Sequence, residues 1–180
     1  MTQRSMHIET KLIHAGEPEP RIEGAVTLPV FQSSTFQYAG QDHYDALKYI
    51  RMNNTPNHVA LHQKLAALEN ADAALVTASG MAAIAGVILG LCNKGDEVVA
   101  SHAIYGGTYA LLHDFLPAKC GIRTCFVDIT DTDAVASVLT DRTRLIFTES
   151  LANPTLRLAD FPRLSGIARD AGIPLVVDNT

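Results

Sequence analysis

The sequence predicts an α/β fold with three layers, in which helices cover both faces of a mostly parallel sheet. Short, nearly continuous apolar segments alternate along the chain with segments of helical pattern. This alternation is typical of parallel strands that are buried on both faces by helices. With 180 residues, 47% of them hydrophobic, the chain can bury one such core. Five segments are strand candidates: Ala73–Val76, Glu97–Ala100, Ile122–Val127, Arg144–Thr148 and Ile173–Val177.

Residues 1–55 differ from the rest of the chain. Pro18, Pro20 and Pro29 interrupt this segment, and neither a helical nor a strand period persists in it. We expect an extended N-terminal arm that packs on another subunit or on a part of the protein outside this sequence, with a disordered leader as the alternative. The α/β domain then occupies residues 56–180.

The first helix of that domain is expected from residue 56 onward. Thr55 can cap it, Pro56 suits its first position, and an apolar stripe follows at Leu61, Leu65 and Leu68. A second helix should begin at Gly80 or Met81 and is too apolar to face water on any side. Three more are expected: one ending at about Phe115 before Pro117 and Gly121, one over Asp131–Leu139, and one capped by Asp160 and stopped by Gly172.

Polar and aromatic residues follow several of these apolar segments. Parallel sheets bind ligands beyond the carboxyl ends of their strands, so these residues should meet at one rim. They are Ser79, Tyr105, Glu149, Asn153 and Asp178.

Three features of this rim match the parts of one ligand. A helix N-terminus at Gly80 and Met81 suits a phosphate, Tyr105 suits a flat ring, and Asp178 suits a protonated ring nitrogen. Pyridoxal phosphate has all three parts. Each residue also has a structural alternative. Asp178 can cap the next element, and Tyr105 can be an ordinary half-buried tyrosine. Glu149 and Asn153 can satisfy loop backbone groups, which is the interpretation we favour for Glu149, and Arg51 can be a solvated arginine.

Composition and motifs argue against other ligands. The formal charge is -5 with a pI near 5.7, and no run of Lys or Arg offers a surface for nucleic acid or membrane. Neither a nucleoside triphosphate, a dinucleotide nor a serine hydrolase motif is present. His58 and His62 lack a third metal ligand, so we expect an exposed helix face and no metal.

Location and thiol state follow from simpler signals. The first ten residues do not resemble a signal peptide, and no apolar run reaches about 18 residues, so we expect a cytoplasmic protein. Its three cysteines form no Cys-x-x-Cys pair. They are expected to be reduced, buried thiols: Cys92, Cys120 and Cys125.

Five motifs in order resemble the cysteine and methionine metabolism (trans-sulfuration) family of pyridoxal-phosphate enzymes of fold type I. That family contains cystathionine synthases and lyases, methionine γ-lyases and O-acylhomoserine sulfhydrylases. The motifs are Tyr49-Ile50-Arg51, the stretch Thr77–Ile84, Tyr105-Gly106-Gly107-Thr108, the stretch Glu149–Thr155, and Val176–Thr180.

The resemblance implies roles for individual residues. The cofactor phosphate would lie at Ser79, Gly80 and Met81. Tyr49 and Arg51 would reach the same phosphate in a neighbouring subunit's site, which makes the protein a homo-oligomer, a dimer or a tetramer. Tyr105 would stack on the ring and take part in catalysis with Asp178, the partner of the ring nitrogen. Asn153 would lie near the ring hydroxyl, and Thr180 behind the ring.

The resemblance also implies an activity. The enzyme would remove the Cα proton of an amino acid and eliminate or replace a sulfur or acyloxy group at Cβ or Cγ. A cystathionine synthase or lyase is the first choice. An O-acylhomoserine sulfhydrylase or a methionine γ-lyase is the alternative, although Gly107 stands where methionine lyases carry cysteine.

The sequence departs from the family pattern in two places. Its Asn54-Thr55-Pro56 order differs from the usual Asn-Pro-Thr, and the family's Schiff-base lysine lies beyond the Val176–Thr180 motif, where this sequence has no further residues. The C-terminal domain is absent as well. We therefore expect the 180 residues to be the N-terminal part of such an enzyme and inactive alone, with a truncated non-catalytic remnant as the alternative of another class.

Overall fold

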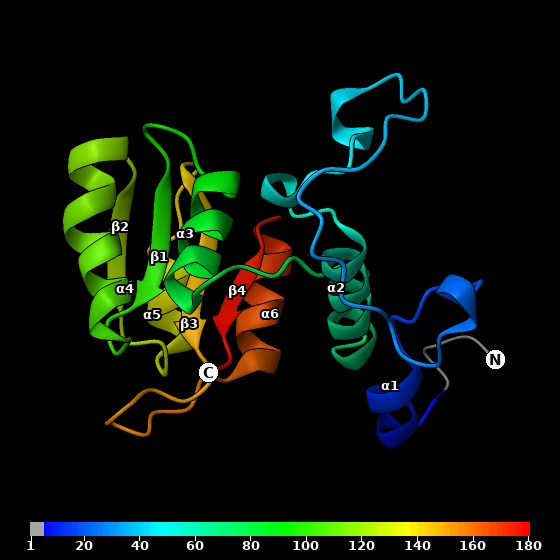
Figure 1. The fold of residues 1–180 in the computed structure, drawn as a ribbon. Helices are drawn as coiled ribbons and strands as arrows, with labels where there is room; N and C mark the ends of the chain where they lie inside the picture. Colours follow the sequence, from blue (N-terminus) through cyan, green and yellow to red (C-terminus); the bar gives the residue numbers. More distant parts are fainter. Residues whose placement is uncertain (1–5) are drawn as a thin grey trace. The chain divides into compact units, whose positions relative to one another are not determined.

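The computed structural model describes residues 6–180, and the chain divides into two compact units, Met1–Thr77 and Ala78–Thr180. Each unit is described below by itself, with the elements labelled in Figure 1. The helix predicted from residue 56 falls in the first unit. The division between an arm of residues 1–55 and a cofactor domain of residues 56–180 stays a prediction.

The second unit is built on a four-stranded sheet in which every neighbouring pair is parallel. The strands lie in the order β2-β1-β3-β4. The connection after β1 runs to β2 at one edge of the sheet and the connection after β3 runs to β4 at the other edge, so the direction switches between β1 and β3. A sheet of this kind has its ligand crevice at such a switch point, beyond the carboxyl ends of the strands. The bounds are β1 Glu97–Ser101, β2 Arg123–Val127, β3 Thr143–Glu149 and β4 Leu175–Asp178.

Helices cover both faces of this sheet, which confirms the predicted three-layer αβα fold (Figure 1). Side chains alternate along β1, so Val98 and Ala100 join one hydrophobic cluster and Val99 joins the other. The first cluster takes Ile88 from α3 and Leu112 from η5. The second contains residues of α5 and α6. The bounds are α3 Gly80–Leu91, α4 Gly106–Ala110, η5 Leu111–Cys120, α5 Thr132–Ser137 and α6 Phe161–Asp170.

The predicted helix starts carry side-chain caps. The carboxylates of Asp131 and Asp160 each accept the backbone N–H of the residue three positions later, at 3.0 and 3.1 Å, as N-cap residues do. The predicted stop at Pro117 is wrong, because this proline lies inside η5, a π-helical segment. The helix ends just before Gly121, the other predicted stop residue, whose φ of 68° suits a residue without Cβ.

Two further expectations for this region are wrong. Residues 73–76 form no strand, since they pair with no neighbour in the described chain and the Leu75 side chain is 71% exposed. The α3 helix is not buried all round, because it packs on the sheet through one side only. Val87, Leu89 and Leu91 remain between 41 and 47% exposed.

The cysteines of the second unit are free thiols, as predicted. Cys92 is buried, whereas Cys120 and Cys125 are half-buried. Burial raises the pKa of the Cys92 thiol and of the Cys125 thiol, with a smaller contribution from a nearby carboxylate in each case. A raised pKa keeps a thiol protonated and unreactive.

The first unit contains two helices, α1 (Ile8–His14), which the sequence analysis did not predict, and α2 (Pro56–Leu68). Each helix supplies a lysine to the carboxyl end of the other. Lys11 is 4% exposed and donates to Ala67 O at 3.0 Å, while Lys64 donates to Leu12 O at 3.1 Å. A positive charge at a helix C-terminus is favourable because the last carbonyl groups have no partner within the helix. Three short 3-10 turns lie between them: η2 Ile22–Gly24, η3 Tyr44–Ala46 and η4 Ile50–Met52.

Helix α2 begins where the sequence predicts, but its side chains behave differently. The Thr55 hydroxyl makes no cap bond and pairs with His58 Nδ1 at 2.8 Å. The apolar stripe that predicted the helix is only partly covered, since Leu61 and Leu65 are 44 and 37% exposed. The expected exposed face at His58 and His62 is also wrong, because both rings are half-buried.

Gly16 fixes how closely the end of α1 approaches α2, and its replacement gives a stability prediction. A Cβ at this position would lie 2.5 Å from both Ala60 O and Lys64 N, and φ is +75°. Gly24 has nearly the same φ, +72°, but a Cβ there would meet nothing within 4 Å.

Gly16→Ala is expected to lower the free energy of unfolding by about 1–3 kcal/mol more than Gly24→Ala, because only the first substitution forces backbone atoms apart. Urea denaturation of the two variants measures the difference. An equal loss of unfolding free energy in the two variants would mean that the positive φ, and not the close approach of the helices, is the reason why Gly16 must be a glycine.

No helix in residues 6–180 is long and apolar enough to span a membrane.

Candidate functional site

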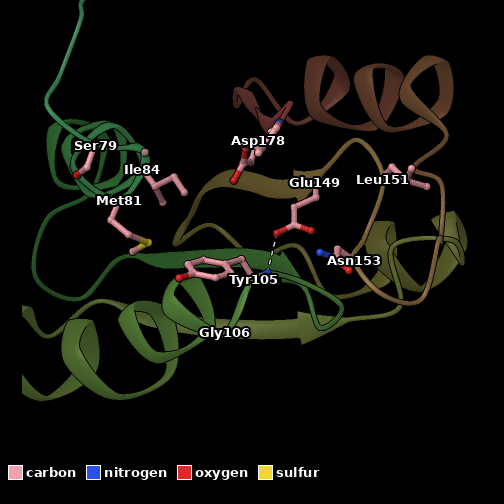
Figure 2. A pocket seen from close by; sticks show the side chains of 11 residues that line it. Ser79, Met81, Ile84, Tyr105, Gly106, Glu149, Leu151, Asn153 and Asp178 are labelled. Atoms are coloured by element: carbon pink, nitrogen blue, oxygen red, sulfur yellow. Dashed lines mark hydrogen bonds between the residues drawn. The ribbon is translucent and has the colours of Figure 1, made fainter.

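A cavity of about 490 Å³ lies in the second unit, beyond the carboxyl ends of β3 and β4 (Figure 2). The rim prediction is correct in its geometry: the five residues named from the sequence for that rim all line this cavity. The described residues that line it are Ser79, Gly80, Met81, Ile84, Tyr105, Gly106, Glu149, Leu151, Asn153, Asp178 and Thr180.

The N-terminus of α3 forms one wall of the cavity. Ser79 caps the helix, since its Oγ accepts the Ala82 N–H at 3.1 Å. The N–H groups of Gly80 and Met81 belong to the first turn, where helical N–H groups have no acceptor within the helix. A Cβ at Gly80 would meet nothing within 4 Å, so a ligand can approach the backbone there. This wall suits an anion such as phosphate.

Tyr105, the residue just before α4, offers its ring to the cavity and is 61% exposed. The ring lies directly beside Gly107, where a Cβ would come within 2.6 Å of Tyr105 Cε1 and 3.3 Å of Met81 Sδ. Thr108, which is fully buried, donates its hydroxyl to the same sulfur at 3.8 Å. Because Gly107 has no Cβ, the Tyr105 ring can occupy this position beside it.

Two carboxylates stand side by side at the ends of β3 and β4. Glu149 and Asp178 are paired in the strand register, and Figure 2 shows both pointing toward the space that the Tyr105 ring borders. Glu149 Oε1 accepts the Tyr105 N–H at 2.6 Å, which confirms its predicted bond to the loop backbone. Asp178 Oδ1 accepts the N–H and hydroxyl of Thr180 at 3.1 and 2.5 Å. Because no Lys or Arg among residues 6–180 lines the cavity, this wall favours a cationic group.

Asn153 belongs to a short hairpin, Leu151–Leu158, whose ends form an antiparallel bridge. The Ala152 N–H donates to Arg157 O at 3.0 Å, and the Leu156 N–H donates to Ala152 O at 2.7 Å. Leu151 and Asn153 line the cavity on either side of Ala152, whose side chain is buried. The hairpin thus carries one apolar and one amide side chain to the site.

Tyr49 and Arg51 belong to the first unit. The Arg51 guanidinium lies over the Tyr49 ring, 4.7 Å from its centroid, an arrangement typical of a cation–π contact. Their assignment to the phosphate of a neighbouring subunit stays a prediction.

Comparison with known proteins assigns the family. The model of the Cys/Met metabolism PLP-dependent enzymes matches residues 9–180. The chain belongs to this family. The PLP-dependent family predicted from five motifs is therefore confirmed, and with it the fold.

Individual members of the Cys/Met metabolism family resemble the chain over nearly its whole length. A methionine gamma-lyase from Arabidopsis thaliana is 45% identical over 88% of the chain, and an O-acetyl-L-homoserine sulfhydrylase from Leptospira meyeri is 38% identical over 98%. The crystal structure of cystathionine gamma-lyase from Lactobacillus plantarum, complexed with L-serine, matches 97% of the chain with a TM-score of 0.86 and 32% identity. The chain spans 37, 41 and 45% of these three proteins, less than half of each.

The cavity fits the family's cofactor, pyridoxal phosphate. The open backbone at Gly80 suits its phosphate, the exposed ring of Tyr105 suits its pyridine ring, and the Asp178 carboxylate suits a protonated ring nitrogen. In the described part of the chain, no cluster of three His, Cys, Asp or Glu side chains could hold a metal ion.

Proposed function

We propose that the protein is a PLP-dependent carbon–sulfur lyase or transferase that acts on sulfur-containing or O-acylated amino acids. The proposal is carried by one observation: a helix N-terminus, an exposed aromatic ring and a strand-end carboxylate line a single cavity. Each feature alone is common in α/β proteins. Together, in a member of this family, they match the three parts of pyridoxal phosphate.

The chain's own residues would divide the work. Gly80 and Met81 bind the phosphate through their N–H groups, with Ser79 fixing the turn, and the Tyr105 ring stacks on the pyridine. Asp178 holds the proton at the pyridine nitrogen. When bound, pyridoxal phosphate supplies an electron sink, which allows the Cα proton of an amino acid and then a group at Cβ or Cγ to leave.

Two residues contribute to orientation. Asn153, which lines the cavity, would bind the cofactor's ring hydroxyl, and Thr180 orients the Asp178 carboxylate through its two bonds to Oδ1. Neither lysine of the second unit, Lys94 or Lys119, lines the cavity, so neither makes the covalent attachment of the cofactor there. This agrees with the expectation that the 180 residues are inactive by themselves.

Cystathionine synthase or lyase activity is our first choice within the family. Methionine γ-lyase is the second candidate, favoured by the relative at 45% identity. The close contact of Gly107 with the Tyr105 ring argues against it, because the cysteine typical of methionine lyases would displace that ring. O-acylhomoserine sulfhydrylase activity, favoured by the relative at 38% identity, is a further alternative.

We further propose a cytoplasmic homo-oligomer in which Tyr49 and Arg51 bind the phosphate of the adjacent subunit. The Arg51 guanidinium, which lies over the Tyr49 ring, is a cation of the kind that binds phosphate, and it supports this proposal.

A substrate panel tests the activity. The protein encoded by the complete gene, purified with pyridoxal phosphate, is assayed on L-cystathionine, on L-methionine, and on O-acetyl-L-homoserine with sulfide. We expect release of a 2-oxo acid from cystathionine, or synthesis of cystathionine when L-cysteine replaces sulfide as the partner of O-acetyl-L-homoserine. The kcat/KM should lie within the usual enzymatic range of about 10⁴ M⁻¹s⁻¹ or more. Turnover of methionine alone would favour the second candidate. Absence of both turnover and cofactor binding would mean that the protein is a non-catalytic remnant.

A further inference from the structure

The hairpin that carries Asn153 to the cavity is held at its far end by an ion pair. Arg157 Nη1 donates to Asp128 Oδ2, and Asp128 follows β2, on the opposite side of the sheet's switch point from β3. The two residues are 29 positions apart in sequence. The contact therefore ties the hairpin after β3 to the loop after β2.

The acidic partner is itself fixed. Asp128 Oδ1 accepts the Thr130 N–H at 3.0 Å and the Thr130 hydroxyl at 2.7 Å, which leaves Oδ2 for the guanidinium. These hydrogen bonds, followed by the Arg157 charge, lower the pKa of the Asp128 carboxyl from 3.8 to about 2. The carboxylate is consequently ionised throughout the pH range in which enzymes of this kind are assayed, and its contact with Arg157 is lost only in strong acid.

The basic partner is connected directly to the site. The Arg157 carbonyl accepts the N–H of Ala152, the residue between the two cavity-lining side chains Leu151 and Asn153. An ion pair that fixes Arg157 therefore fixes the backbone from which Asn153 projects. The remaining cross-hairpin bonds, from Leu156 to Ala152 and from Ala159 to Ser150, continue the same ladder.

We infer that Arg157 is a positioning residue, whose ion pair with Asp128 holds the hairpin Leu151–Leu158 so that Asn153 lines the cofactor cavity. The part of this inference that concerns the hairpin is independent of the cofactor. The part that concerns cofactor binding rests on the proposed function.

The chain offers a matched control. Arg163 of α6 pairs with Asp133 of α5 at 3.5 Å, and this pair is also an exposed contact between elements distant in sequence. It touches neither the hairpin nor the cavity lining. Loss of Arg163 removes the same charge from the same unit without releasing Arg157.

The experiment measures amide hydrogen exchange of residues 150–159 by mass spectrometry, in the protein encoded by the complete gene and without added cofactor. Arg157→Ala is expected to speed exchange there about two- to five-fold, the size expected for one partly exposed ion pair, and Arg163→Ala is expected to leave it unchanged. Arg157→Lys should restore most of the protection, because the observed contact uses a single N–H donor. Asp128→Asn provides a second test of the same contact should Arg157→Ala fold poorly.

The second measurement is retention of pyridoxal phosphate on dialysis, followed by absorbance. Faster exchange together with weaker retention in Arg157→Ala, but not in Arg163→Ala, supports the full inference. Unchanged exchange in both Arg157→Ala and Asp128→Asn overturns it. If the unmodified protein binds no pyridoxal phosphate, the proposed function fails, whereas the exchange data still decide whether the ion pair holds the hairpin.

Discussion

Asp178→Asn is expected to lower kcat/KM on the best substrate by about 10²- to 10³-fold, the usual cost of removing one preorganised electrostatic contact. Asparagine keeps the size of the side chain, and its amide oxygen still accepts from Thr180. It lacks the negative charge that would keep a proton on the pyridine nitrogen. The loss should therefore fall mainly on kcat, with pyridoxal phosphate still bound through the α3 N-terminus.

Glu149→Gln supplies the matched control for this prediction. It removes one negative charge from the same wall, at the position paired with Asp178 in the strand register. If overall charge mattered more than the individual contact, the two substitutions would have equal effects. Steady-state kinetics of both variants, with thermal unfolding to establish that each is folded, decides the question. An Asp178→Asn enzyme with unaltered kcat/KM would remove the ring-nitrogen assignment.

The second large effect is expected for Glu149→Ala, with a loss of about 10- to 100-fold in kcat/KM, because a displacement of about 1 Å of a positioned group can cost that much. The substitution deletes the acceptor of the Tyr105 N–H and releases the turn that carries the ring. Glu149→Gln keeps an acceptor oxygen at the same place and should lose less than about ten-fold. Titration of pyridoxal phosphate, read by absorbance, should give a weaker affinity for the alanine variant only. Equal kinetics for alanine and glutamine would mean that the carboxylate does not act through Tyr105.

The sheet could be predicted because its strands are short apolar segments, and the two central strands, β1 and β3, are buried on both faces. The same reasoning failed at residues 73–76, where an apolar run has no strand beside it. A strand exists only through its hydrogen-bonding partner, which local sequence does not reveal. Helix α1 could not be predicted for a related reason. It has no side-chain cap, and its end is stabilised by Lys64, which donates to Leu12 O and lies 52 positions away from it in the sequence.

The members of the site could be predicted from the rule that ligands lie beyond parallel strand ends, together with the family motifs. Their contacts could not. The bond from Tyr105 to Glu149 joins residues 44 positions apart and depends on the backbone of one loop meeting the side chain of another. Arg157 and Asp128 gave no signal at all, because an Arg in a loop and an Asp after a strand are ordinary surface residues until the fold brings them together.

The strand order β2-β1-β3-β4 also bears on how this unit can form while the chain is being synthesised. Strand β1 emerges from the ribosome first, β2 joins one of its edges, β3 joins the other, and β4 extends the sheet beyond β3. Each new strand finds an open edge, and none has to insert between two strands already paired. Parallel pairing is intrinsically slow because long connections must close before contacts form. Here synthesis and assembly can proceed in the same order, from the centre of the sheet outward.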